Sequence, residues 1–317
     1  MDSVSLKKGV MIRSSIDIGT NSVLLLVADV TDNGIDVLYE EQHVPRLGKN
    51  VDKDRTLHPN SQKRVISVLK IFQKKIQDDF SDLTEQPIVT ATSAVRDASN
   101  RDEFLDKVKR ELGWEIRILS GNEEAETTYA GAVSVLTPDD ISRPVIIDIG
   151  GGSTEFATGA GVQFKSGISL NIGSVRFTER YFDSDPPLQS EIRSARKAIQ
   201  QELGKLEKIY RNGVLVGVAG TVTSIAAIEM GLDDYQSDKL NGYRLHRSTV
   251  ADFIQEFSES KSEIIERTYP PFLTGRGEVI LAGILILDEF LKMTDRDELI
   301  ISTGGIRHGI LLKKKEI

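Results

Sequence analysis

A seven-residue motif that occurs twice places the strongest constraint on this chain. Residues 16–22 read IDIGTNS, and residues 147–153 read IDIGGGS. Each copy joins a short strand pattern to a second one through a turn of glycine and small polar residues, which indicates a β-hairpin. Chance similarity is the alternative, but the shared Asp-Ile-Gly in the same strand context favours duplication. Two such halves facing each other would form a cleft, where ligands commonly bind.

Alternating strand and helix patterns follow each copy of the motif. Apolar periodicity predicts helices over residues 60–80, 100–112, 123–135, 189–210 and 277–293. We therefore expect an α/β protein with an N-terminal domain of residues 1–125 and a C-terminal domain of residues 126–302. A closing helix within residues 303–317 could pack back on the first domain.

Composition narrows the class of protein. The 317 residues suffice for two domains, and 39% hydrophobic with 28% charged residues is typical of a soluble globular protein. No stretch approaches the roughly 20 apolar residues that cross a membrane, and residues 1–10 lack an apolar core of signal-peptide length. We expect a cytoplasmic protein without membrane contact. The net charge of −8 disfavours non-specific nucleic-acid binding.

The residue types that are missing exclude several chemistries. Because the chain has no cysteine, it has no cysteine nucleophile, thiolate metal site or disulfide framework. Its four histidines are too scattered for a zinc-type spacing, and we interpret them as surface or packing residues.

Both copies of the motif have the residues of a phosphate-binding turn. Small residues let backbone N–H groups approach an anion, and hydroxyl and amide side chains add donors. A single glycine turn is weak evidence, since any hairpin can carry one, but two that each follow an acidic strand end are stronger. The candidate phosphate-binding residues are Gly19, Thr20, Asn21 and Ser22 in the first copy and Gly150, Gly151, Gly152, Ser153 and Thr154 in the second.

An aspartate precedes each turn, Asp17 in the first copy and Asp148 in the second. A carboxylate beside a phosphate would repel it unless a cation lies between them. The two residues therefore indicate Mg²⁺, which takes one or two carboxylates together with waters and phosphate oxygens. The alternative is that each aspartate only caps its own turn through an Asx-type hydrogen bond.

Other strand-to-helix turns are weaker candidates. Gly220 and Thr221 could direct a helix N-terminus toward an anion, although any α/β protein has such turns. Ser93 and Arg96 follow another strand, and Arg96 could clamp phosphate oxygens or pair with a surface acid. Residues 120–124 (SGNEE) suit a helix cap, yet a carboxylate there, between the repeats, could also deprotonate an attacking water.

Together these segments resemble the exopolyphosphatase / guanosine pentaphosphate phosphohydrolase (Ppx/GppA) family. The resemblance spans residues 13–311 and is carried by residues 16–22 (IDIGTNS), 91–98 (ATSAVRDA), 118–125 (ILSGNEEA), 145–156 (VIIDIGGGSTEF) and 218–224 (VAGTVTS). It implies the duplicated RNase H-like fold of the actin, Hsp70 and sugar-kinase superfamily. It also implies Mg²⁺ dependence, stepwise release of terminal phosphate from polyphosphate or guanosine pentaphosphate, and a homodimer.

Roles follow from this resemblance by motif position. Glu124 falls on the catalytic glutamate, Asp148 and Glu155 on the acidic positions around the metal and water, and Asp17 on a phosphate loop. Arg96 falls on the arginine that faces the cleft, and we expect Glu155 and Arg96 to be further catalytic residues. Together with the argument for Mg²⁺ above, the expected metal-binding residues are Asp17, Asp148 and Glu155. Longer family members have an additional C-terminal helical domain that is absent from this sequence, so we expect shorter polyphosphates or guanosine pentaphosphate as substrates. Two alternatives from other classes stay open. One is an ATP-dependent phosphotransferase, since related folds bind adenosine near the Gly220 turn, and the other is a non-catalytic nucleotide or polyphosphate sensor.

Overall fold

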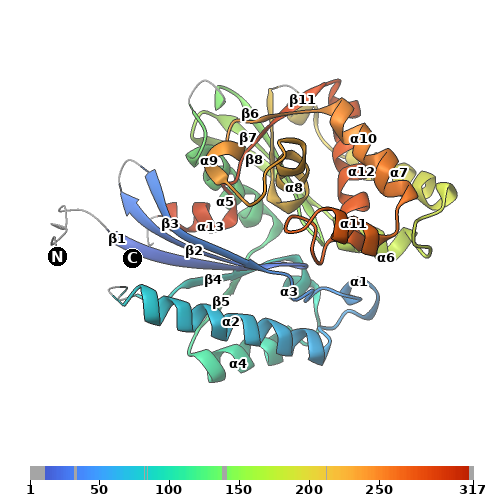
Figure 1. Ribbon diagram of the computed structural model, residues 1–317. Helices are drawn as coiled ribbons and strands as arrows, with labels where there is room; N and C mark the ends of the chain where they lie inside the picture. The colour runs from blue at the N-terminus through green and yellow to red at the C-terminus, as the bar shows by residue number, and fades with distance from the viewer. Residues whose placement is uncertain are drawn as a thin grey trace.

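The structure is a computed structural model that describes residues 11–31, 34–81, 83, 85–137, 141–211 and 213–313. The chain forms two α/β halves, each built around its own sheet (Figure 1). Among these residues, no helix is long and apolar enough to cross a membrane.

The first sheet has five strands in the order β3-β2-β1-β4-β5. The first three strands pair antiparallel, and β4 and β5 continue from β1 in parallel. The strands are β1 (Met11–Ile18), β2 (Val23–Thr31), β3 (Gly34–His43), β4 (Ile88–Ala91) and β5 (Ile116–Ile118). Two amphipathic helices, α2 (Pro59–Asp79) and α4 (Arg101–Leu112), cover one face of the sheet (Figure 1), and their apolar stripes supply buried residues such as Phe72 and Phe104. The short helices α1 (Val51–Asp54) and α3 (Ser93–Asp97) lie in the connections.

The second sheet repeats this order. It runs β8-β7-β6-β9-β11, with β10 added antiparallel at the far edge. Its first three strands again pair antiparallel and the next two in parallel. The strands are β6 (Pro144–Ile149), β7 (Thr154–Ala160), β8 (Gln163–Leu170), β9 (Val214–Val218), β10 (Arg244–His246) and β11 (Glu298–Ile301). The shared strand order and directions confirm the duplicated α/β fold that the repeated motif predicts.

Helices surround the second sheet, and α12 (Gly277–Thr294) is the most deeply buried of them because it is apolar on nearly all sides. The expected helix over residues 189–210 is wrong in length. Helix α7 (Gln189–Leu203) ends before Gly204, a residue that favours helix termination, and a 3₁₀ turn follows at Lys208–Arg211. The remaining helices are α6 (Ser174–Tyr181), α8 (Ala219–Glu229), α9 (Ser237–Leu240), α10 (Arg247–Glu259) and α11 (Ser262–Thr268).

Two helices cross between the halves. Helix α5 (Gly121–Ser134) follows the first sheet but packs on β7 and β8, whereas α13 (Ile306–Leu312) follows the second sheet but packs on β1 and β2 (Figure 1). Leu311 of α13 joins Leu26 and Ala28 in one buried cluster, and the guanidinium of Arg13 donates a hydrogen bond to the Leu311 carbonyl at 3.0 Å. The expected domain boundary after residue 125 falls inside α5, and the last residues of the expected closing helix lie outside the described residues.

The crossing helices α5 and α13 approach each other closely through glycines. A Cβ added at Gly309 would overlap the carbonyl oxygen of Thr127, and one at Gly131 would overlap the carbonyl oxygen of Gly305. The contact between the two helices therefore depends on the absence of side chains at these positions.

Gly309→Ala is expected to lower the free energy of unfolding by about 2–3 kcal/mol, because the new methyl group would force the two helices apart. The urea midpoint measures this effect. Gly305→Ala is the matched control, since a Cβ there would meet no atom within 4 Å and the backbone is extended. Equal midpoints for the two variants would contradict the close helix contact.

Candidate active site

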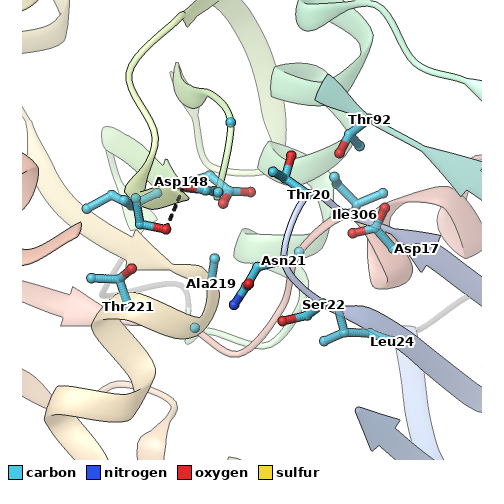
Figure 2. Close-up of a pocket in the computed structure, with 18 of the residues that line it drawn as sticks. Asp17, Thr20, Asn21, Ser22, Leu24, Thr92, Asp148, Ala219, Thr221 and Ile306 are labelled. Carbon is cyan, nitrogen blue, oxygen red and sulfur yellow. Dashed lines mark hydrogen bonds between the residues drawn. The ribbon is translucent and has the colours of Figure 1, made fainter. Parts of the chain in front are cut away.

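A pocket of about 160 Å³, partly open to solvent, lies between the two halves. Its walls come from both repeated turns, from the start of α8 and from the segment that leads into α13. Figure 2 shows Thr20, Asn21 and Ser22 on the first turn, with Asp17 on one side and Asp148 on the other. Residues far apart in the sequence therefore meet in one cavity.

The two repeated turns have the same main-chain geometry. The Gly19 N–H donates to the Ser22 carbonyl at 2.9 Å, and the Gly150 N–H donates to the Ser153 carbonyl at 3.0 Å. Each turn is thus closed by its own backbone. Asp17 Oδ1 is buried without a hydrogen-bond partner, so the Asx-type cap that we considered as an alternative does not occupy this oxygen.

The second turn has glycines where the first has side chains because the two turns touch. A Cβ on Gly151 would lie 2.9 Å from the Cβ of Thr20, and a Cβ on Gly152 would overlap the Ser93 hydroxyl. Thr20 and Ser93 belong to the first half. The GGG sequence therefore lets the turn of the second half dock directly on the first half.

Four carboxylates converge on the pocket. Asp148 and Glu155 are cross-strand partners on β6 and β7, which places their side chains on one face of the sheet. Asp17 is the last residue but one of β1, and Glu124 lies in the first turn of α5. Hydrogen bonds fix three of them: Asp148 accepts from Thr128 at 3.0 Å, Glu155 from Ser169 at 2.6 Å and Glu124 from Arg96 at 2.7 Å.

Burial raises the pKa of every one of these acids, and repulsion by a neighbouring carboxylate adds to the shift at Asp17, Glu124 and Glu155. Burial, and then the charge of Asp148, raise the pKa of Asp17 to about 7, although Arg307 opposes the shift. Burial raises the pKa of Asp148 to about 6, and burial with the Asp148 charge raises that of Glu155 to about 8. Burial and the charge of Glu155 also raise the pKa of Glu124, against the opposing charge of Arg96. The pocket is therefore short of positive charge.

A divalent cation would supply that missing charge. In the described part of the chain, no group of three or more His, Asp or Glu residues forms a protein-only metal cage. Mg²⁺ does not need one, because it keeps waters and binds substrate phosphates alongside one or two carboxylates. The unpartnered Asp17 oxygen and the nearby charge of Asp148 are the kind of donor set that this ion accepts.

Without Mg²⁺, the protein is expected to lose stability as pH rises from about 4 to about 8. Asp17, Asp148 and Glu155 hold protons in the folded state at pH values where the unfolded chain has released them, so raising the pH favours unfolding. For Asp17 alone, we expect the free energy of unfolding to fall by about 2 kcal/mol over this pH range. This is less than the full pKa shift implies, because part of the carboxylate faces the pocket.

Urea midpoints measured between pH 4 and pH 8 test this dependence, with Asp17→Asn as the variant that removes one titrating group. The urea midpoint should fall less steeply with pH in the variant than in the wild-type protein. Addition of Mg²⁺ at pH 8 should restore the stability that the wild-type protein has lost. A wild-type midpoint that is flat or rises over this range would contradict the repulsion between the acids.

Most residues that the sequence indicates do line the pocket. They are Asp17, Gly19, Thr20, Asn21, Ser22, Ser93, Glu124, Asp148, Gly150, Gly151, Gly152, Ser153, Glu155, Gly220 and Thr221. Arg96 and Thr154 do not. Arg96 binds Glu124 and the Leu119 carbonyl instead of facing the cavity, and the Thr154 hydroxyl donates to the Ile172 carbonyl.

Two arginines that line the pocket, Arg276 and Arg307, were not predicted from the sequence. The guanidinium of Arg276 packs against Gly220 and donates to the Ser22 hydroxyl at 3.3 Å, and burial lowers its pKa to about 10. Arg307 pairs with Glu40 at 3.1 Å and also faces the cavity. Two features of the sequence could have indicated them. Arg276 stands directly before the apolar helix α12, and Arg307 stands just after the Gly304-Gly305 turn.

Comparison with known proteins identifies the relatives of this chain. The sequence model of the Ppx/GppA phosphatase family matches residues 26–316. A bifunctional 3-dehydroquinate synthase/phosphatase from Fusobacterium nucleatum is 33% identical over 98% of this chain, and the match covers 47% of that protein. Exopolyphosphatase 2 from Mycobacterium tuberculosis is 30% identical, and the match covers 94% of this chain and 97% of that protein. The solved structure of the Aquifex aeolicus PPX-GPPA enzyme is 33% identical, with a TM-score of 0.80 over 96% of this chain and all of that one.

Proposed function

Because this chain belongs to the Ppx/GppA phosphatase family, we propose that it is an exopolyphosphatase that releases terminal orthophosphate from inorganic polyphosphate. One observation carries the proposal. The pocket combines two turns of the phosphate-binding type, one from each half, with buried carboxylates that include Glu124, the base in this proposal. The relative from M. tuberculosis that this chain nearly matches in length bears the name of this activity.

The proposed reaction is an in-line attack of water on the terminal phosphorus. Glu124 accepts a proton from the water while the new P–O bond forms, and the bridging P–O bond breaks so that the shortened chain leaves as an oxyanion. Arg96, which donates to Glu124 at 2.7 Å, holds the carboxylate in place and favours its ionised form. Catalysis of this kind depends chiefly on positioning and on electrostatic stabilisation.

The substrate would be held from both sides of the cleft. Thr20 and Ser22 on the first turn, and Ser153 on the second, line the pocket together with the backbone of both turns. The helix α8 directs its N-terminal turn, with Gly220 and Thr221, into the same cavity. Arg276 adds a half-buried positive charge beside Ser22, which suits a polyanion.

Asp17, Asp148 and Glu155 are the residues that would hold Mg²⁺ in this proposal, with bound waters between the ion and some of their carboxylates. When bound, Mg²⁺ supplies positive charge for the oxygens of the transferred phosphoryl group. Localisation in the cytoplasm and assembly as a homodimer are also proposed, on the composition of the chain and on its resemblance to the family respectively.

The alternative functions differ in the substrate or the reaction that they require. Guanosine pentaphosphate hydrolysis uses the same chemistry on a nucleotide end, and it stays the second candidate because it belongs to the same family. The ATP-dependent phosphotransferase has less support, since the turn at Gly220 meets the guanidinium of Arg276. A sensor would bind phosphate chains without turnover.

Phosphate release with Mg²⁺ from a panel of substrates tests the proposal. The panel is short polyphosphate, long polyphosphate, guanosine pentaphosphate and ATP, with EDTA-treated enzyme as the control. We expect release from polyphosphate that EDTA abolishes. Faster release from guanosine pentaphosphate would favour the second candidate. Binding of every substrate without release would reject hydrolysis and favour the sensor.

A further inference from the structure

A buried arginine outside the pocket connects the two halves. Arg176 lies on α6 of the second half, is 6% exposed and does not line the active-site cavity. The arginine nevertheless contacts groups that do line the cavity.

The guanidinium of Arg176 donates in three directions. Its Nε–H donates to the carbonyl of Gly152, in the turn of its own half, at 2.5 Å. Its Nη2 group donates to Asp97 at 2.7 Å and to the Ser93 hydroxyl at 3.4 Å, and Nη1 donates to Asp52. The last three partners all belong to the first half, on α1 and α3.

Neighbouring residues of α6 strengthen this connection. Arg180 donates to both oxygens of Asp52, at 2.5 and 2.8 Å, and Glu179 accepts from the backbone N–H of Asn50 at 2.8 Å. Burial disfavours the Asp52 carboxylate, but the hydrogen bonds and charges of Arg180 and Arg176 lower its pKa overall. Helix α6 is therefore held against the first half by several polar contacts, of which those of Arg176 are the most buried.

The arrangement requires arginine. A guanidinium is planar and carries donors in fixed directions, so it can bind a carbonyl on one edge and two carboxylates on the others, whereas a lysine ammonium is a compact point charge on a flexible stem. The positions of two groups that Arg176 binds, on Ser93 and Gly152, also bear on its role. Ser93 and Gly152 face each other across the junction of the halves so closely that Gly152 has no room for a Cβ. Arg176 binds both of them.

We propose that Arg176 is a positioning residue that locks the second phosphate turn against the first half and so sets the spacing of the phosphate-binding groups on the two sides of the cleft. The proposal rests on the proposed function, because it assumes that these turns hold the substrate. It predicts that loss of Arg176 lets the halves separate and leaves the turns out of register, with the catalytic glutamate itself intact.

Steady-state kinetics provide the first test. Arg176→Met is expected to lower kcat/KM for polyphosphate by about 10- to 100-fold, with a fall in kcat as well as a rise in KM, because small displacements of positioned groups are costly. Arg176→Lys should recover only part of this loss. Asp97→Asn, which keeps the arginine but removes one partner, should give a smaller loss and guards against failure of Arg176→Met to fold.

Arg196→Met is the matched control for a purely structural effect. Arg196 also bridges two buried carboxylates, Asp288 and Glu289, but all three residues lie in the second half, outside the pocket. This variant should lose stability and keep kcat and KM. If Arg176→Met and Arg196→Met show equal kcat and KM at a temperature where both are folded, the positioning role is wrong.

The distance between the halves provides a second test that needs no turnover. Because the chain has no cysteine, spin labels can be attached at Asp102→Cys in the first half and Arg193→Cys in the second, both at exposed positions. We expect one narrow distance distribution in the otherwise wild-type protein and a longer, broader one with Arg176→Met. Identical distributions would overturn the proposal whatever the substrate is. Wild-type protein that releases no phosphate would instead reject the proposed function, and the label distances would still decide the role of Arg176.

Discussion

Glu124→Gln is expected to lower phosphate release from polyphosphate by about 10³-fold, because glutamine has the same shape but cannot accept a proton from the attacking water. Glu124 is 5% exposed, faces the pocket and is held by Arg96. Substrate binding should persist, since the substitution removes a negative charge from a site for polyanions. Phosphate release and the affinity for polyphosphate are the two measurements.

The adjacent glutamate supplies the control for this variant. Glu123 accepts hydrogen bonds from the Ser120 backbone and from Arg117, which lower its pKa to about 2, and its side chain forms the capping box of α5. Glu123→Gln keeps a capping residue and should release phosphate at nearly the wild-type rate. Equal losses in the two variants, or none in Glu124→Gln, would remove Glu124 from its proposed role as the base.

Asp148→Asn is expected to abolish the effect of Mg²⁺ on both activity and stability. Phosphate release should fall by at least about 10²-fold, because charge stabilisation by a bound metal ion contributes several kcal/mol to such reactions. Without Mg²⁺ the variant should be more stable than wild type at pH 8, since the repulsion that Asp148 exerts on Asp17 and Glu155 is gone.

Urea midpoints with and without Mg²⁺ separate these effects from activity. Mg²⁺ at 100 times its dissociation constant should stabilise wild type by about 2.7 kcal/mol and leave Asp148→Asn unchanged. Thr128→Val, which removes only the hydrogen bond to Asp148, should retain most of the response. The exposed Asp106→Asn should behave as wild type. An undiminished Mg²⁺ response in Asp148→Asn would exclude this residue from the metal site.

The repeated motif made the fold and much of the pocket predictable from the sequence. A turn next to an acidic strand end is a local pattern, and duplication places two such turns opposite each other. The long-range contacts of single side chains have no local pattern. The pairing of Arg96 with Glu124, the position of Arg276 against Gly220 and the bridge made by Arg176 all join segments that are brought together only in the folded chain.

The ends of helices were also hard to predict from local sequence patterns. Apolar periodicity predicted α12 well because most residues of this helix are apolar and buried. It overextended α7, because buried Leu206 and Tyr210 continue the apolar pattern after the helix itself has ended at Leu203. The expected boundary at residue 125 lies within α5, where the change of half is not marked by a break in the local sequence pattern. The strand β5 and the helix α5 are adjacent in sequence, but they pack in different halves.

The crossing of α13 has a consequence for how the protein is made. A ribosome delivers β1, β2 and β3 early, yet the helix that covers Leu26 and Ala28 is the last element in the described chain. Until Leu311 emerges, this apolar face of the first sheet has no helix from its own chain to cover it. The first half therefore cannot reach its final packing until the second half has been synthesised and α13 has emerged, so completion of the first half is coupled to synthesis of the second.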